Sequence, residues 1–274
     1  MKMPYPIIAA IIVSALAGLI ALPRLLDSMG LRKKNFKGDM IPAAYGVQIA
    51  YFAVLGCAII RVLDLSPARI TMQYAVLIGG MAAFGFLDDA FGSRETGGFA
   101  GHFKKLLLER KLTTGAVKAI GGGALALALG WSVSKAAPDW IINSLLIALS
   151  ANALNLVDLR PGRALAVFAI GLLAVTAACG FRLSGAWPLA ALILPTAILA
   201  HKDVRGQAMM GDTGSNPLGA ALGLTIAIDG PLSVKFTTIG LLIVLHLICE
   251  RYSLSQIIER NPILRRIDSL LGVR

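Results

Sequence analysis

Apolar runs of about 18 residues recur along this chain and are separated by short polar loops. A helix of that length crosses the hydrocarbon core of a bilayer, so each run predicts a membrane-spanning helix. The runs are apolar throughout, whereas the strands of a membrane barrel would alternate between apolar and polar residues. With 57% hydrophobic residues among 274, the chain is expected to be an all-α, polytopic membrane helical bundle.

The runs predict about nine transmembrane helices in one bundle, residues 1–249, followed by a cytoplasmic tail, residues 250–274. In the tail, Ser253 and Gln256 have the spacing of a capping box, and Pro262 predicts a new helix start. Apolar residues on one face of each half predict two short amphipathic helices at the interface; a docking element for a partner is the alternative. The nine predicted spans are 5–22, 42–60, 70–87, 114–132, 140–157, 164–181, 186–200, 214–228 and 231–249.

The basic residues orient this bundle. Of the 26 lysines and arginines, 20 fall in the odd-numbered loops and the tail, and 6 fall on the other side. By the positive-inside rule, the first group faces the cytoplasm, which places the N-terminus outside and the tail inside. Membrane orientation thus accounts for the net charge of +11, and we expect no nucleic-acid partner.

Three polar motifs lie where predicted spans meet loops on the cytoplasmic side. A carboxylate at that depth is costly in lipid, so it marks a candidate functional site. Oxygen ligands without clustered His or Cys favour Mg²⁺ or Mn²⁺ over zinc. Ion pairing with loop lysines and arginines is the alternative role. The candidates are Asp88 and Asp89 in the first motif, Asn152, Asn155 and Asp158 in the second, and Asp212, Gly214 and Ser215 in the third.

Geometry refines these expectations. Adjacent Asp88 and Asp89 point about 100° apart on a helix, so they are not expected to share one ion. The N–H groups of the glycine-rich turn 211–216 can bind a phosphate before a helix start, although a plain cap by Thr213 or Ser215 explains the pattern equally well. Asn152 and Asn155 share a helix face and suit either a ligand or a neighbouring helix.

Together, the motifs resemble those of the polyprenyl-phosphate N-acetylhexosamine-1-phosphate transferases, which include phospho-N-acetylmuramoyl-pentapeptide transferase. They read Phe86-Leu-Asp-Asp89, Asn152-Ala-Leu-Asn-Leu-Val-Asp158 and Met210-Gly-Asp-Thr-Gly-Ser215, in the family's order. The resemblance covers most of the chain from Asn35. It implies Mg²⁺-dependent transfer of a sugar-1-phosphate from a UDP-N-acetylhexosamine derivative to undecaprenyl phosphate, with release of UMP, for cell-wall synthesis at the bacterial cytoplasmic membrane.

Carried over by motif, the resemblance implies a role for each candidate. Asp212 is the main Mg²⁺ ligand, and Asp158 and Asn155 line the metal and nucleotide region. Asp88 and Asp89 lie at the lipid phosphate, one of them as the base. Lys111, in a segment similar to the family's Lys-Leu-Thr-Thr-Gly, contacts the diphosphate.

The sequence also departs from the family pattern. The middle motif of the family continues Asp-Gly-Leu-Asp-Gly, whereas this chain has Leu159, Arg160 and Pro161 after Asp158. The histidine cluster that the pentapeptide transferases carry in the last cytoplasmic loop has no counterpart near Arg251. Arg160 can replace a metal-linked interaction with a direct phosphate contact.

Two alternatives to the enzyme therefore stay open. The first is a non-catalytic homologue that binds the lipid carrier, or that joins an envelope assembly or a homo-oligomer through its tail. The second is a transporter whose acids form an ion path. Transporter acids usually lie near the bilayer midplane, whereas these gather at one face, and the chain shows no internal repeat.

Overall fold

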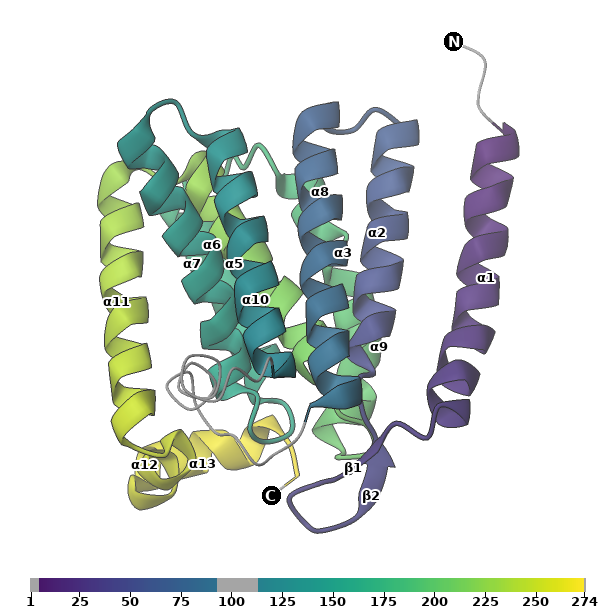
Figure 1. Ribbon diagram of the computed structural model, residues 1–274, viewed down its shortest axis with the longest axis vertical. Helices are drawn as coiled ribbons and strands as arrows, with labels where there is room; N and C mark the ends of the chain where they lie inside the picture. Colours follow the sequence, from purple (N-terminus) through teal and green to yellow (C-terminus); the bar gives the residue numbers. More distant parts are fainter. Residues whose placement is uncertain (1–4, 93–112, 274) are drawn as a thin grey trace.

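The structure is a computed structural model that describes residues 5–92 and 113–273, and this part of the chain is almost entirely helical. Upright helices form a bundle, with the start of the first helix at one end and two short C-terminal helices at the other (Figure 1). The all-α prediction is confirmed, and the helices follow the apolar runs of the sequence.

Eight of the nine predicted spans are single helices, displaced by a few residues at their ends. The second span starts later than expected, because Pro42 ends a strand and the helix begins at Gly46. The eight helices are α1 (Tyr5–Ser28), α2 (Gly46–Val62), α3 (Ala68–Phe91), α5 (Thr114–Val133), α6 (Ala137–Val157), α7 (Arg163–Ala178), α10 (Asp212–Asp229) and α11 (Leu232–Arg251).

The prediction of one helix over residues 186–200 is wrong. The chain forms α8 (Ala186–Ala190) and α9 (Ile193–Val204), with a break between them. Pro195 lacks the N–H that would bond to the Ala191 carbonyl in a continuous helix, and proline is tolerated only in the first turn of the new one. Neither piece is long enough to cross a bilayer alone.

Within the described residues, five helices are long and apolar enough to cross a membrane, namely α1, α3, α5, α6 and α11. Two more, α2 and α7, are apolar but shorter. The chain therefore has the character of a membrane protein.

Helix α10 forms the centre of the bundle. It packs mainly against α6 and α3, and 15 of its residues are buried. Gly219 and Gly223 face the main chain of α6 at Ser150 and Leu146, so a Cβ at either glycine would collide with a carbonyl oxygen. Small residues of this kind let two helix backbones approach closely in lipid.

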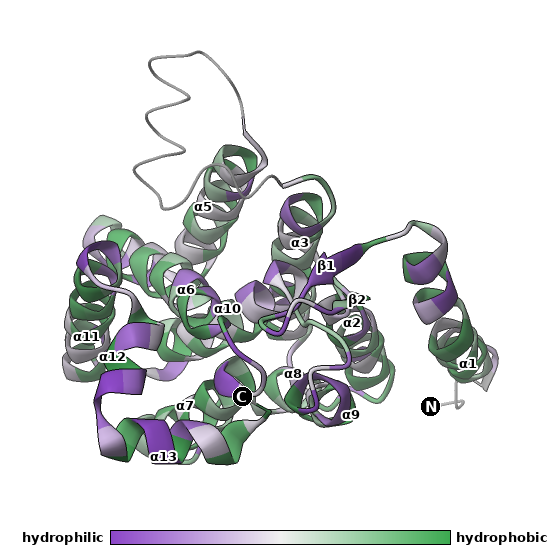
Figure 2. Cartoon of the chain, turned by 90° about the horizontal axis from the view of Figure 1, so that it is seen from below, coloured by the Kyte–Doolittle hydropathy of each residue, from purple (hydrophilic) through white to green (hydrophobic). Residues whose placement is uncertain are grey.

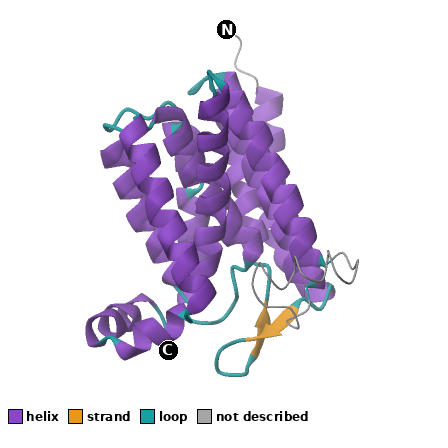
Figure 3. Ribbon diagram, turned by 60° about the vertical axis from the view of Figure 1, so that its left-hand side comes forward, coloured by secondary structure: helices purple, strands orange, loops and turns teal. Residues whose placement is uncertain are grey.

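A small β-hairpin connects α1 to α2 and projects from the end of the bundle that carries the tail (Figure 3). Strand β1 (Arg32–Lys34) pairs antiparallel with β2 (Met40–Pro42), and the Asn35 side chain accepts hydrogen bonds from the backbone N–H groups of Lys37 and Asp39 in the turn. The segment after β2 bonds to Met209 and Met210, so the hairpin is tied to the turn that starts α10.

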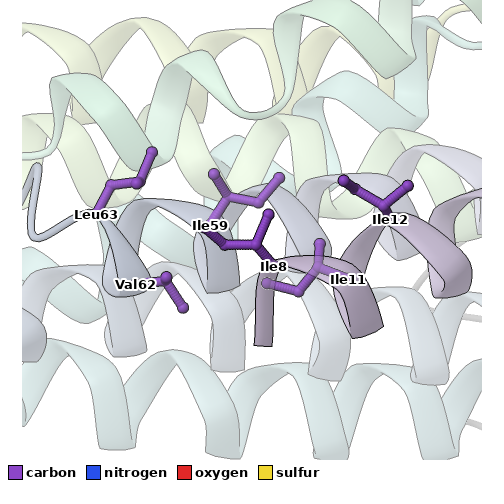
Figure 4. Close-up of a pocket in the computed structure, with 6 residues that line it drawn as sticks. All are labelled: Ile8, Ile11, Ile12, Ile59, Val62 and Leu63. Carbon is purple, nitrogen blue, oxygen red and sulfur yellow. The ribbon is translucent and has the colours of Figure 1, made fainter. Parts of the chain in front are cut away.

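Helix α1 stands to one side of the bundle and packs against α2 (Figure 1). A hydrogen bond joins the hydroxyl groups of Ser14 and Tyr51. Beside it, six aliphatic side chains surround an apolar hollow of about 260 Å³ between the two helices (Figure 4). They are Ile8, Ile11, Ile12, Ile59, Val62 and Leu63.

The tail folds into two short helices, as predicted: α12 (Leu254–Arg260) and α13 (Pro262–Leu271). Asn261 caps α13, because its side chain accepts from the N–H groups of Ile263 and Leu264. The predicted capping box does not form, since the Ser253 side chain makes no cap hydrogen bond and its hydroxyl is left outside the turn.

Candidate active site

The three acidic motifs converge on one cluster at the end of the bundle that carries the hairpin and the tail. At its centre is Lys118, in the second turn of α5. Its Nζ lies 3.4 Å from Asp88 Oδ2 at the end of α3, and it also pairs with Asp212 at the start of α10. One ammonium group thus bridges carboxylates from two separate motifs.

The second motif reaches the same cluster through Asn155. The Asn155 Nδ2 lies 3.5 Å from Asp212 Oδ2, and its Oδ1 accepts from the Ser215 hydroxyl at 3.3 Å. With the amide turned over, its nitrogen donates to Asp212 Oδ1 at 2.8 Å and its oxygen accepts from Lys118 at 3.3 Å. In either orientation Asn155 holds the Asp212 carboxylate in place.

Asp89 points away from this cluster, as the helical spacing predicts. It is buried, and its Oδ2 accepts from both the backbone N–H of Thr213 at 2.9 Å and the Thr213 hydroxyl at 2.6 Å. Lys33 of the hairpin lies 3.7 Å from its other oxygen. Asp89 therefore joins α3, α10 and the hairpin, and it positions the site.

In the glycine-rich turn at 211–216, three of the N–H groups that the sequence suggested for a phosphate are already bonded within the protein. The N–H of Thr213 goes to Asp89, and those of Gly214 and Ser215 go to the Gly211 carbonyl. Neither Thr213 nor Ser215 caps α10 with its side chain. Gly214 and Ser215 are buried and form part of the wall of the site.

Two glycines allow the close approach of α3 and α10. Gly211 has φ +68°, in the left-handed region that favours glycine, and a Cβ there would collide with the Asp89 carboxylate. Gly85 lies one turn before Asp89, where a Cβ would meet the main-chain carbonyl of Asp212. These contacts fix the separation of the two acidic motifs.

Asp158 follows the last turn of α6, close to other acids. Burial raises the pKa of Asp158 well above its usual range, and the carboxylates of Asp203, Asp212 and Asp89 raise it further. Asp203 is itself buried, and its two oxygens accept from the backbone N–H groups of Gly162 and Met210 at 2.8 and 3.4 Å. It thereby joins the loop after Asp158 to the turn before Asp212.

A cavity of about 920 Å³ opens beside the cluster, between α5, α6 and α11. Lys118, Asn152, Asn155 and Asn216 give it a polar region, and most of its remaining wall is apolar. His246 also lines it. Its Nδ1 bonds to the Leu242 carbonyl, while its Nε2 has no partner among the described residues.

Two candidates remain, Arg160 and Lys111. Arg160 contacts the tail and the hairpin: its guanidinium lies 3.4 Å from Glu259 and stacks over the Phe36 ring at 4.9 Å. These contacts do not support a direct phosphate contact by Arg160. Lys111 falls outside the described residues, as does most of the third loop.

Lys118, Lys33 and Asp203 were not identified from the sequence. Lys118 counted only as a positive-inside loop residue, although it lies inside an apolar run just after Thr113, whose hydroxyl caps α5. A lone cation within a predicted span is the signal that would have found it.

The charges of the cluster suit a cation. Four carboxylates, those of Asp88, Asp89, Asp158 and Asp212, gather at this end of the bundle, and Lys33 and Lys118 form ion pairs with three of them. The described residues contain no set of three or more His, Cys, Asp or Glu side chains that could hold a metal by themselves. Mg²⁺ needs only one or two carboxylates when it shares phosphate oxygens with a substrate, so Asp88 and Asp212 fit it.

No family model matches the sequence. The chain is 25% identical over 249 residues to the phospho-N-acetylmuramoyl-pentapeptide-transferase of Moorella thermoacetica, an alignment that covers 80% of this chain and 73% of that protein. The chain is thus a distant homologue of a transferase, which agrees with the resemblance seen in the motifs.

Proposed function

We propose that this protein transfers a sugar-1-phosphate from a UDP-N-acetylhexosamine derivative to a polyprenyl phosphate such as undecaprenyl phosphate, and that UMP is released. The observation that carries the proposal is the bridge from Lys118 to Asp88 and Asp212 at the polar region of a largely apolar cavity. The distant similarity to a pentapeptide transferase supports the same reaction type.

The cavity favours an amphiphilic acceptor. A polyprenyl phosphate has a long apolar chain and one anionic head, and the cavity has an apolar wall with Lys118 and three asparagines in its polar region. Lys118 can pair with a phosphate, and the apolar wall can cover the first isoprene units. A soluble sugar nucleotide would leave that wall uncovered.

In the proposed reaction, each residue of the cluster has a separate role. An oxygen of the lipid phosphate attacks the β-phosphorus of the UDP-sugar, and the bond from that phosphorus to the bridging oxygen of UMP breaks. Asp88, half-buried beside Lys118, holds the proton of the lipid phosphate as the base. Lys118 balances the charge, while Asn155 orients Asp212 and Asp89 positions the turn before it.

Mg²⁺ is part of the proposal. Asp212 would hold it, with Asp88 and Asp158 as the nearby carboxylates, and Asn152 would face the nucleotide or sugar. When bound, the ion neutralises charge on the diphosphate. Mn²⁺ has similar ligand preferences and would substitute.

The proposed function also implies a membrane location and an orientation. We place the chain in a bacterial cytoplasmic membrane, with the N-terminus outside and the cluster, hairpin and tail inside; in this topology α8 and α9 together make one crossing. The charge distribution supports this orientation, because 20 of 26 basic residues belong to the proposed inner side. The product would enter cell-envelope glycan synthesis, of which peptidoglycan is one case.

The test is UMP release by purified protein with undecaprenyl phosphate, Mg²⁺ and a panel of UDP-sugars. Asp212→Asn should abolish release, whereas Asp64→Asn, at an exposed aspartate beyond α2, should retain it. Release by wild type that needs both lipid and metal would establish the reaction. Lipid binding without any release would refute it.

One observation favours the non-catalytic alternative. The segment after Asp158 is used to hold the tail, because Arg160 pairs with Glu259 and the Pro161 carbonyl lies against Gly272. A chain that kept the fold for lipid binding alone would retain these contacts. In the assay above it would bind undecaprenyl phosphate and release no UMP with any sugar nucleotide.

A further inference from the structure

Helix α13 presents an apolar face that the bundle does not cover. Ile263, Ile267 and Leu270 recur at helical spacing and are 71%, 51% and 80% exposed. We refer to these three residues as the outer face of α13. Three aligned aliphatic side chains at this exposure would be unfavourable in water, so a partner is expected to cover them.

The opposite side of α13 is fixed to the bundle. Asp268 accepts from Arg163 at 2.6 and 2.9 Å in a buried ion pair, and Arg163 also donates to the Ser255 hydroxyl. Beyond the helix, the N–H of Val273 donates to the Val204 carbonyl at 2.9 Å. Because these contacts set the rotation of α13, the outer face cannot turn inward.

The position of α13 agrees with a membrane surface. The helix lies with α12 at the foot of the bundle, below the upright helices (Figure 1), and it runs along the outer edge of that end when seen from below (Figure 2). It packs against α7, which exposes Val167, Ile170 and Leu173. A helix in this orientation lies in the plane of the bilayer, at the level of the headgroups.

The charges of α13 select the kind of surface. Arg265 and Arg266 are exposed, and so is Arg260 just before the helix. The acid of α13, Asp268, is buried against Arg163. The accessible charge of α13 is therefore positive, which attracts anionic headgroups and repels a second copy of the same helix.

We propose that the outer face of α13 lies in an anionic lipid leaflet, with Arg265 and Arg266 at the lipid phosphates. Through Arg163 and the contacts near Gly162, the leaflet then braces the loop that follows Asp158. This inference concerns the tail and does not depend on the proposed transfer reaction.

The test compares two labels on α13 in the full-length protein. Ile267→Cys and Ser269→Cys are made in a background with Cys57, Cys179 and Cys249 replaced by Ala, and each is labelled with bimane. Both positions are exposed, but they lie about 160° apart around the helix. Each protein is placed as a single copy in nanodiscs of phosphatidylglycerol with a doxyl-labelled phosphatidylcholine.

Quenching of the label at 267 should be at least about twofold stronger than at 269. The difference should shrink when the discs hold only phosphatidylcholine, and also with Arg265→Gln and Arg266→Gln together. Equal quenching at both positions would overturn the proposal, as would a difference that ignores both changes. Shielding of 267 only in discs with two copies would assign the face to a dimer and also overturn it.

Discussion

Thr213 donates both its backbone N–H and its hydroxyl to a single oxygen of Asp89, at 2.9 and 2.6 Å. The pair joins the last turn of α3 to the first turn of α10, and the two residues are 124 positions apart in sequence. Together with the close contacts at Gly85 and Gly211, this pair sets the distance between the first and third acidic motifs.

Thr213→Val keeps the shape of the side chain and removes the hydroxyl. One oxygen of a buried carboxylate then loses a donor, which costs about 1–3 kcal/mol. We expect a lower melting temperature in detergent and weaker UMP release. Thr213→Ser, which retains the hydroxyl, should behave like wild type, and equal damage from both variants would argue against the hydrogen bond as the cause.

Gly85→Ala tests the close approach of α3 to α10. Its Cβ would collide with the Asp212 main chain, and overpacking of this kind costs about 1–3 kcal/mol. Gly79→Ala in the same helix is the matched control, because nothing lies within 4 Å of a Cβ there. The control should be neutral or gain up to about 1 kcal/mol from helix propensity. The melting temperatures of both variants test this prediction. A similar loss of stability in both would contradict a close-packed contact at Gly85.

Lys118→Met should reduce turnover strongly while leaving the fold intact. Without the ammonium, Asp88 and Asp212 repel each other and the substrate phosphates lose a partner. Removing one preorganised charge of this kind lowers kcat by about 10²–10³-fold. Single-turnover UMP release measures the effect, with Lys135→Gln at the opposite end of α5 as control. Unchanged turnover would remove Lys118 from the site.

Asp268→Asn should release the tail. Arg163 would remain buried without its carboxylate, and breaking one partner of a buried pair costs about 3–5 kcal/mol. Trypsin should then cleave after Arg260 and Arg265 faster than in wild type. Ser269→Ala, an exposed neighbour, should leave the cleavage rate unchanged. A tail that stays protected in Asp268→Asn would show that other contacts hold it.

Much of the fold follows from hydrophobic run length. Eight predicted spans became helices because a long apolar run in lipid can satisfy its backbone only as a helix. The seventh predicted span is not one helix, because Pro195 lacks the N–H that a continuous helix needs, although the segment is apolar. The hairpin at residues 32–42 was not predicted, because strands of three residues are too short to show the alternation by which strands are recognised.

The sequence identifies the acidic residues that gather at the candidate site, but it does not identify the residues that bond to them. Asp88, Asn155 and Asp212 meet because each follows or begins an apolar run on one side, and this much can be read from spacing. The pairing of Asp89 with Thr213 cannot, since it depends on which helices are neighbours. Asp203 was missed for the same reason, because it bonds to the backbone of two separate segments. Lys118 was missed although its place inside an apolar run is a signal in the sequence.

The burial of α10 has a consequence for how the molecule is made. Synthesis runs from the N-terminus, so α3 and α6 exist before α10 emerges, and until then Asp88 and Asp89 have no Thr213 or Asp212 beside them. Until then, the faces of α3 and α6 that pack against α10 stay unpaired. A nascent chain that pauses before residue 212 would be a substrate for quality control. Insertion of α10 fills the space between α3 and α6 and completes the site.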